Sequence, residues 1–338
     1  MPPAKKKNLT VAVTGPTGTF GYGLMPLLEA DERIARVVGI ARREFDPVSE
    51  GWSKMQYRRG DVREPDALEQ AFRGADVVVH LAFMITGTAS RQTIRAINVE
   101  GTLNAFRAAA AAGAKRFVYA SSVAAYGFHS DNPIGMTEEW PVRPAARLFY
   151  AQEKAEIERL LEEESAAHPK LKLYLLRPPI VVGPHTVGGK DLMPGPVAAV
   201  GKRLMSLLER LPVPLPAIAP DLPVQLIHEE DVGRAFLQCI VAAGPPGAYN
   251  IAGDGVLTGA EVAREFNLAP LLRIPAGVVQ SAAGAVASLP APSFLPPATE
   301  WVEAATHPAI MDVSKAKREL GWKPRYSTLE ALRDTLGR

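Results

Sequence analysis

The sequence predicts an α/β fold: a doubly wound parallel sheet with helices on both faces, followed by a smaller, mostly helical C-terminal lobe. Two observations lead to this prediction. In the first half of the 338 residues, short β-branched runs alternate with helical stretches, which is typical of βαβ units. The run Asp76–Leu81 is apolar apart from Asp76 and His80, as expected for a strand that is covered on both faces.

The elements follow from the same periodicity, taken in order along the chain. We expect strands at Asn8–Val13, Arg36–Ile40, Arg58–Asp61, Ala75–Leu81, Lys115–Ala120 and Lys172–Leu176, and helices at Phe20–Ala30, Pro65–Phe72, Thr93–Ala112 and Phe149–Ser165. After Leu176 the composition and the periodicity change: residues 178–223 are rich in Pro, Leu, Val and Ala, and their hydrophobic periodicity is weak. The first pattern then returns in the strand Val224–Ile227, the helix Asp231–Val241 and the strand Ala248–Ile251. We therefore expect residues 1–177, with returning segments at about 224–252, to form the sheet domain. Residues 178–223 and 253–338 are expected to form the lobe.

The composition excludes several classes of protein. Apolar residues make up 47% and charged residues 22%, as in an ordinary globular chain, and the net charge of +2 weighs against nucleic acid as a partner. The single cysteine, Cys239, rules out a disulfide within the chain and suits a reducing, cytoplasmic location. The six histidines show no ligand spacing, so no metal site is predicted. No run of about 20 apolar residues predicts a membrane span.

A glycine-rich turn follows the first strand, with the spacing G-x-x-G-x-x-G between Gly15 and Gly21. Glycine removes the Cβ atom, so backbone N–H groups approach phosphate oxygens closely, and the helix that follows supplies partial positive charge. This context indicates a Rossmann-type dinucleotide site, while the alternative is a tight turn that only packs the helix on the strand. The predicted pyrophosphate contacts are Gly15, Thr17, Gly18, Thr19, Phe20 and Gly21.

The end of the second strand bears on which dinucleotide is bound. A carboxylate at this position would hold the ribose 2′-hydroxyl of NAD, but the chain reads Ile40-Ala41-Arg42-Arg43. Arg42 and Arg43 offer planar guanidinium groups that bind a 2′-phosphate bidentately. The sequence therefore favours NADP, with NAD left open and a pair of solvated arginines as the alternative.

Tyr150 and Lys154 are four residues apart in a helical stretch, so both side chains lie on one face. A free phenol has a pKa of about 10, and a nearby ammonium favours the phenolate and brings the pKa closer to a useful range. Lys154 is also placed to hold the nicotinamide ribose. The preceding strand ends in Ser121 and Ser122, at the carboxyl edge where such sheets bind ligands. The sequence thus predicts Ser122, Tyr150 and Lys154 as a proton-transfer group, against the alternative of an unrelated surface tyrosine and lysine.

With these motifs in place, the chain resembles the extended short-chain dehydrogenase/reductase family, the NAD(P)-dependent epimerase/dehydratase-like group. The matching segments are Thr14–Gly21, Gly60–Val62, His80–Ala82, Asn98–Thr102, Ser121–Gly127, Tyr150 with Lys154, Leu176–Pro178, Gly183-Pro184, His228–Val232 and Leu320–Pro324. The resemblance implies that Ser122 assists Tyr150, that Asp61 contacts the adenine, and that Ala82 and Phe83 line the cofactor. Val62, Leu81 and Pro178 complete the expected cofactor site, whereas His80 and Asn98 are expected to be structural.

At some positions this sequence differs from the residues typical of known subfamilies, and these differences indicate which reaction to expect. Sugar-nucleotide dehydratases carry an acidic pair after the catalytic Ser/Thr, but here the positions are Val123 and Ala124; epimerases usually carry an Asn where this chain has Ile180. The apolar stretches Leu204–Leu222 and Ala276–Pro297 suit a hydrophobic substrate or simply form the core of the lobe.

We therefore expect an NADP(H)-preferring alcohol dehydrogenase or ketoreductase for a moderately apolar carbonyl, similar to 3β-hydroxysteroid dehydrogenases and carbonyl reductases. The alternatives are a nucleotide-sugar epimerase that uses the same tyrosine, lysine and serine, and a non-catalytic NADP-sensing regulatory protein. The resemblance also implies a homodimer through the helices Thr93–Ala112 and Phe149–Ser165. Gln152 and Glu153 depart from the family pattern, which has small residues before the lysine.

Overall fold

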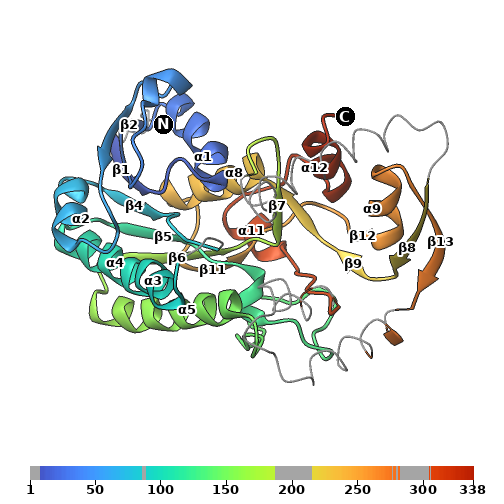
Figure 1. The fold of residues 1–338 in the computed structure, drawn as a ribbon. Coiled ribbons are helices and arrows are strands. Elements are labelled where there is room, and N and C mark those ends of the chain that lie inside the picture. The colour runs from blue at the N-terminus through green and yellow to red at the C-terminus, as the bar shows by residue number, and fades with distance from the viewer. Residues whose placement is uncertain are drawn as a thin grey trace.

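The computed structural model describes residues 8–85, 89–186, 215–275, 277–278, 281, 304 and 306–338. Its centre is a seven-stranded parallel sheet with the order β11-β6-β5-β4-β1-β2-β3 (Figure 1). The strands are β1 (Leu9–Thr14), β2 (Ile34–Ala41), β3 (Met55–Arg59), β4 (Val77–His80), β5 (Arg116–Ala120), β6 (Lys172–Arg177) and β11 (Gly247–Asn250). The strand order reverses between β1 and β4, and ligands bind such sheets at the carboxyl end of this switch point. The predicted α/β fold is confirmed.

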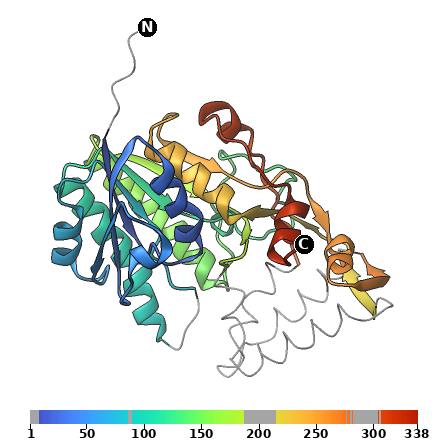
Figure 2. The same ribbon diagram turned by 90° about the horizontal axis from the view of Figure 1, so that it is seen from above.

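Helices cover both faces of the sheet, as Figures 1 and 2 show. Helices α1 (Thr19–Ala30) and α8 (Glu229–Ile240) lie on one face, where Leu24, Leu28 and Phe236 join the core. Helices α2 (Pro65–Phe72), α4 (Gly101–Ala111) and α5 (Phe149–Ala167) cover the other face. The strands between them are buried, and this accounts for their nearly continuous apolar sequences.

The helix expected over Thr93–Ala112 is interrupted. It consists of α3 (Arg91–Arg95), a π-helical turn η2 (Ala96–Glu100) and α4. The side chain of Asn98, in the π turn, bonds the backbone of Met84, and Thr102 Oγ1 donates to the Asn98 carbonyl. The contact between Asn98 and Met84 joins residues that are distant along the chain, so the local periodicity does not reveal the irregular turn.

The third strand lies earlier than expected, at Met55–Arg59 instead of Arg58–Asp61. Met55 pairs with Val37 of β2, which fixes the register. Asp61 leaves the sheet because its carboxylate accepts the backbone N–H of Arg63 in the following turn.

The remaining described elements lie mainly beyond the sheet, toward the right of Figure 1. Three strand pairs occur there: β7 (Ile180–Val182) with β10 (Leu226–His228), β8 (Leu215–Pro220) with β13 (Leu268–Ile274), and β9 (Pro223–Val224) with β12 (Leu257–Thr258). The helices there are α9 (Gly259–Glu265) and α12 (Thr328–Thr335), whereas α11 (Ser314–Glu319) packs against β11. Two short 3-10 turns belong to the sheet part of the chain: η1 (Pro47–Glu50) follows β2, and η3 (Val123–Tyr126) follows β5. The described part of the lobe thus holds paired strands as well as helices, and the division of the chain at residue 177 stays a prediction.

Candidate active site

The glycine turn after β1 is closed by two positions where only glycine fits. Gly15 has a φ of +67°, and a Cβ atom there would lie 3.0 Å from the backbone N and Cα of Ala82. A Cβ atom on Gly21 would lie 1.9 Å from the carbonyl oxygen of Pro16. The turn therefore brings the backbone after β1, the start of α1 and the segment after β4 into close contact.

The start of α1 is suited to an anion. Gly18 caps the helix without a side-chain hydrogen bond, and the first turn carries no acidic residue. Thr17, Thr19 and Phe20 are partly exposed beside it. The partial positive charge of the helix N-terminus is consequently not neutralised locally, which fits the pyrophosphate predicted for this turn.

His80 ties the end of β4 to its neighbours. Its Nδ1 lies 2.8 Å from Thr14 Oγ1, and its Nε2 lies 3.0 Å from Thr102 Oγ1. Burial lowers the pKa of His80 to about 3, so the ring is neutral. Thr14 Oγ1 also accepts the N–H groups of Leu81 and Ala82, at 3.2 and 3.3 Å. His80 thus positions the segment that is expected to line the cofactor, in agreement with the structural role predicted for it.

The three predicted proton-transfer residues lie together at the carboxyl end of β5. Ser122 caps η3, and its Oγ accepts the N–H of Ala124 at 3.1 Å. The Tyr150 hydroxyl, from the first turn of α5, shares a hydrogen bond with the Ser122 side chain. Lys154 lies one helical turn further and is only 3% exposed. The fold therefore assembles a hydroxyl, a phenol and an amine from two segments of the chain.

Lys154 is held by a defined set of groups. Its Nζ donates to the Ala120 carbonyl at 2.6 Å and to the Tyr119 hydroxyl at 3.1 Å, and it lies 3.7 Å from the centre of the Phe83 ring. Burial lowers the pKa of Lys154 to about 7. Both the ammonium and the amine are therefore populated near neutral pH.

The pKa of Tyr150 differs from the sequence-based expectation. We expected the neighbouring ammonium to lower it, but burial raises the pKa of Tyr150 above its usual value, with the Ser122 hydrogen bond acting in the opposite direction. The physical reason is the position of the amine: Lys154 Nζ bonds Ala120 and lies 5.8 Å from the centre of the Tyr150 ring. At neutral pH the phenol accordingly keeps its proton and is available as a donor.

At the adenosine end of the predicted cofactor site, the carboxylate of Asp61 is already engaged. Arg63 donates to it through Nε at 3.0 Å and through a terminal nitrogen at 2.7 Å, and this side-chain bond holds the pKa of Asp61 below its usual range. Arg42 and Arg43 are exposed nearby, and the charge of Arg42 also acts on Asp61. Arg63 adds a third cation that the sequence reasoning missed, although its place two residues after the aspartate was a signal.

The remaining predicted cofactor residues border the same edge of the sheet. The Val62 carbonyl accepts Asn104 Nδ2 at 3.2 Å, and the Pro178 carbonyl accepts the N–H of Val123 at 2.9 Å. Phe83 lies edge-on to Tyr150, with ring centres 5.5 Å apart.

A buried ion pair beneath the site was also missed. Ser121 Oγ donates to the Glu158 carboxylate, which accepts Arg177 Nε at 2.9 Å; another Arg177 nitrogen donates to the Tyr126 hydroxyl at 2.7 Å. Glu158 and Arg177 are 2% and 3% exposed, so the pair is withdrawn from solvent. It joins α5 and β6 to Ser121, the residue next to Ser122 at the end of β5. The sequence signal was an arginine at the end of an apolar strand, together with a glutamate four residues after Lys154.

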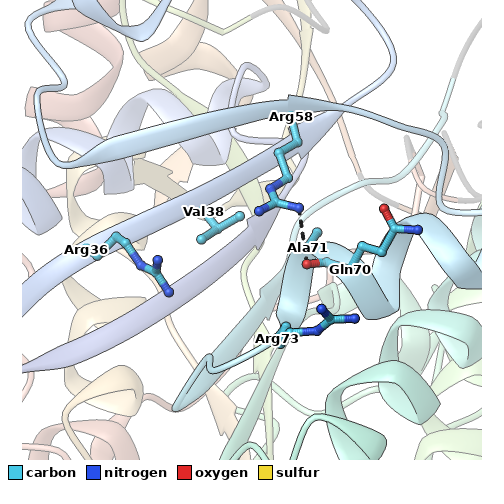
Figure 3. Close-up of a pocket in the computed structure, with 6 residues that line it drawn as sticks. All are labelled: Arg36, Val38, Arg58, Gln70, Ala71 and Arg73. Atoms are coloured by element: carbon cyan, nitrogen blue, oxygen red, sulfur yellow. Dashed lines mark hydrogen bonds between the residues drawn. The ribbon is translucent and has the colours of Figure 1, made fainter.

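A cavity of about 420 Å³ lies elsewhere, between the β2–β3 face and α2, and Figure 3 shows its lining. It is bordered by Arg36, Val38, Arg58, Gln70, Ala71 and Arg73. None of these residues belongs to the predicted cofactor or proton-transfer sets, so the cavity is separate from the candidate site. Across the described residues, no group of three or more His, Cys, Asp or Glu side chains is arranged to hold a metal ion.

The apolar substrate walls predicted at Leu204–Leu222 and Ala276–Pro297 fall mostly outside the described residues. What is described around Tyr150 is nevertheless apolar: the ring packs in a cluster with Leu148, Phe128 and Ala304. Among the described residues, the surroundings of the Tyr150 ring are therefore largely apolar. Within the described ranges, no helix combines the length and apolar character needed to cross a membrane.

Comparisons with known proteins show to which family the chain is similar. The model of the NAD dependent epimerase/dehydratase family matches residues 11–252. A ceramide reductase from Caulobacter vibrioides is 29% identical over 229 residues, which cover 67% of this chain and 59% of that protein. UDP-glucose 4-epimerase 2 from Oryza sativa subsp. japonica is 27% identical over 351 residues, covering 96% of this chain and 80% of that protein. The Bordetella bronchiseptica enzyme WbmG, solved in complex with NAD and UDP, has a TM-score of 0.68 at 20% identity, covering 97% of this chain and 92% of that one.

Proposed function

Because the chain belongs to the NAD dependent epimerase/dehydratase family, whose members are enzymes, we propose that it is an NAD(P)-dependent oxidoreductase that interconverts a ketone and a secondary alcohol on a moderately apolar substrate. The observation that carries the proposal is the hydrogen-bonded pair Ser122–Tyr150 beside the buried amine of Lys154, in apolar surroundings. Such a pair handles one proton at one oxygen, which is what carbonyl reduction requires.

The residues present fit a nicotinamide dinucleotide, because the cradle formed at Gly15 and Gly21 leaves no room for a Cβ atom and opens onto the N-terminus of α1. When bound, the cofactor supplies the hydride that adds to the carbonyl carbon. Tyr150 donates its proton to the carbonyl oxygen, and the product is the secondary alcohol. Ser122 hydrogen-bonds the same oxygen and orients it. Lys154, with a pKa of about 7, is suited to hold the ribose and to return a proton toward Tyr150.

Three features support an apolar substrate. Val123 and Ala124 are buried and carry no acid for a dehydration step. Ile180 is 63% exposed and offers no polar contact to a sugar diphosphate. The similarity to a ceramide reductase, whose name denotes reduction of a lipid, points the same way.

A nucleotide-sugar epimerase is the second candidate, and specific observations favour it. The similarity to UDP-glucose 4-epimerase 2 extends over nearly the whole chain, and WbmG holds NAD and UDP. The same tyrosine, lysine and serine would serve, with the hydride returned to the other face of the sugar. A non-catalytic NADP sensor is less well supported, since a sensor has no use for the assembled proton-transfer group.

The test is turnover with a panel of ketones of increasing apolar length and with UDP-sugars, each with NADPH and with NADH. We expect reduction of an apolar ketone and its loss in Tyr150→Phe. Tyr174→Phe is the matched control, because the Tyr174 hydroxyl bonds the Gly244 carbonyl, outside the residues of the candidate site. Epimerised UDP-sugar without net cofactor oxidation would instead establish the second candidate.

The preference for NADP is part of the proposal. Arg63 pairs with Asp61 and the charge of Arg42 also acts on it, while the neighbouring Arg43 is exposed; Arg42 and Arg43 have no carboxylate partner among the described residues. Planar cations of this kind bind a 2′-phosphate well. Comparing the affinities for NADPH and NADH tests this point directly.

We further propose a homodimer through α4 and α5, by resemblance, and a cytoplasmic location, because the single cysteine, Cys239, suits a reducing compartment. Sedimentation velocity of the purified chain tests the first proposal, and cell fractionation tests the second.

A further inference from the structure

Glu153 occupies a position where the family pattern has a small residue, directly before Lys154. Its side chain does not extend into solvent: the residue is 8% exposed on the face of α5 that meets η2. Burial raises the pKa of Glu153, because a charged carboxylate is less stable away from water. A buried carboxylate is retained only when hydrogen-bond donors satisfy it, so its partner is informative.

That partner is the amide of Asn98. Asn98 Nδ2 donates to Glu153 Oε2 at 2.7 Å and to the Met84 carbonyl at 2.9 Å, while Asn98 Oδ1 accepts the Met84 N–H at 2.7 Å. Both amide hydrogens are thus used, and both backbone polar groups of Met84 are fixed. The π turn η2 places Asn98 where it reaches α5 and Met84 at once.

Met84 directly follows Phe83, and the Phe83 ring touches the predicted proton-transfer group. The ring centre lies 3.7 Å from Lys154 Nζ and 5.5 Å from the centre of the Tyr150 ring. Fixing Met84 therefore fixes the aromatic wall that covers the amine and excludes water from it.

We propose that Glu153 is a positioning residue, which orients the Asn98 amide so that Met84 is pinned and Phe83 stays packed against Lys154 and Tyr150. The part of this inference that concerns turnover rests on the proposed function, whereas the part that concerns the Phe83 wall does not.

The charge of Glu153 offers a competing explanation, because the carboxylate also acts electrostatically on Lys154, as does Glu158. Arg91 and Arg95 face Glu153 from α3, and Glu156 faces it from α5. Glutamine separates the two effects. In Glu153→Gln the side-chain oxygen still accepts from Asn98, but the negative charge is gone.

The experiment compares Glu153→Gln, Glu153→Ala and Asn98→Asp with Glu163→Ala. Glu163 is an exposed residue of the same helix, paired only with Arg159 among the described residues. The first measurement is binding of NADPH and NADH by fluorescence titration, without substrate. We expect Glu153→Ala and Asn98→Asp to weaken binding about tenfold, because a buried polar group loses its partner. Glu153→Gln and Glu163→Ala should stay within about threefold of the wild type.

The second measurement is the pH dependence of cofactor binding and of turnover. Both Glu153 variants lose the negative charge that raises the pKa of Lys154, but only in Glu153→Ala does the displaced Phe83 ring let water reach the amine and raise its pKa again. The profile of Glu153→Ala should therefore lie at higher pH than that of Glu153→Gln. Wild-type binding in Glu153→Ala and Asn98→Asp would overturn the inference, and so would equal losses in Glu153→Gln and Glu153→Ala. Should Glu153→Ala not fold, Glu153→Ser, whose short side chain does not reach the Asn98 amide, takes its place. A wild type that reduces no ketone would refute the proposed function but leave the titrations readable.

Discussion

The buried amine of Lys154 makes the stability of the protein depend on pH in a defined way. Its pKa falls from 10.5 to about 7 on folding, because burial disfavours the ammonium. Between these two values the unfolded chain binds a proton at this residue that the folded chain has largely released. The free energy of unfolding therefore rises with pH across this interval, by up to about 1.4 kcal/mol per pH unit for one proton.

The size of the effect follows from the two pKa values. From about pH 7 to about pH 8.5, the amine contributes a gain of about 1.5 kcal/mol, allowing for its partial protonation at the lower pH. Two other buried groups act mainly outside this range. Because the pKa of His80 is lowered to about 3, protonation of this residue destabilises the fold in acid. The raised pKa of Cys239 lowers the stability as an exposed thiol ionises, chiefly above about pH 8.5.

The assay is urea unfolding of the cofactor-free protein at several pH values in this range, with Lys154→Met as the comparison. Methionine fills the same volume with an uncharged chain. We expect the wild type to gain stability as pH rises and the variant to show little change. If Lys154→Met keeps the wild-type slope, the amine is not the titrating group, and the account of its burial is wrong.

Three further predictions follow from the site. Tyr150→Phe should lower turnover by about 100-fold or more, because general acid catalysis contributes that much. The affinity for the reduced cofactor, measured by titration, should stay unchanged. Turnover equal to that of the wild type would remove Tyr150 from the mechanism. Arg42→Ala should weaken NADPH binding about tenfold and leave NADH binding unaltered, whereas Arg73→Ala, an equal loss of charge in the separate cavity of Figure 3, should change neither. Gly15→Ala should lower the free energy of unfolding in urea by about 1–2 kcal/mol, because alanine is strained at a φ of +67°. The variant should also bind the cofactor more weakly, because the new Cβ atom displaces Ala82. Stability and affinity that both equal those of the wild type would contradict the role given to the turn.

Local chemistry made much of the fold predictable. Helix α2 begins and ends at the residues expected, since Pro65 is suited to the first helical position and the strand that follows the helix is plainly apolar. The glycine spacing located the turn after β1 because positive φ and close approach leave no other residue. Ser122, Tyr150 and Lys154 could be grouped because parallel strands end at one edge and helical residues four apart share a face.

What the sequence did not reveal depends on partners that are distant along the chain. Asn98 reaches Met84 only because a π turn rotates it, and no local pattern marks that turn. The raised pKa of Tyr150 was missed because the direction in which Lys154 points is set by the carbonyl of Ala120. Spacing predicts which side chains are neighbours, but it does not say how each hydrogen bond is shared among them.

The ion pair of Glu158 and Arg177 has a consequence for engineering. Arg177 is the last residue of β6, immediately before the chain leaves the sheet, and its guanidinium also contacts Tyr126. Removing one member of such a buried pair strands the other charge and costs about 3–5 kcal/mol. A chimera that borrows its variable region from a relative should therefore be joined after Pro179, so that the recipient keeps its own arginine. A junction placed a few residues earlier would replace Arg177 with the relative's residue, next to Glu158 and Tyr126.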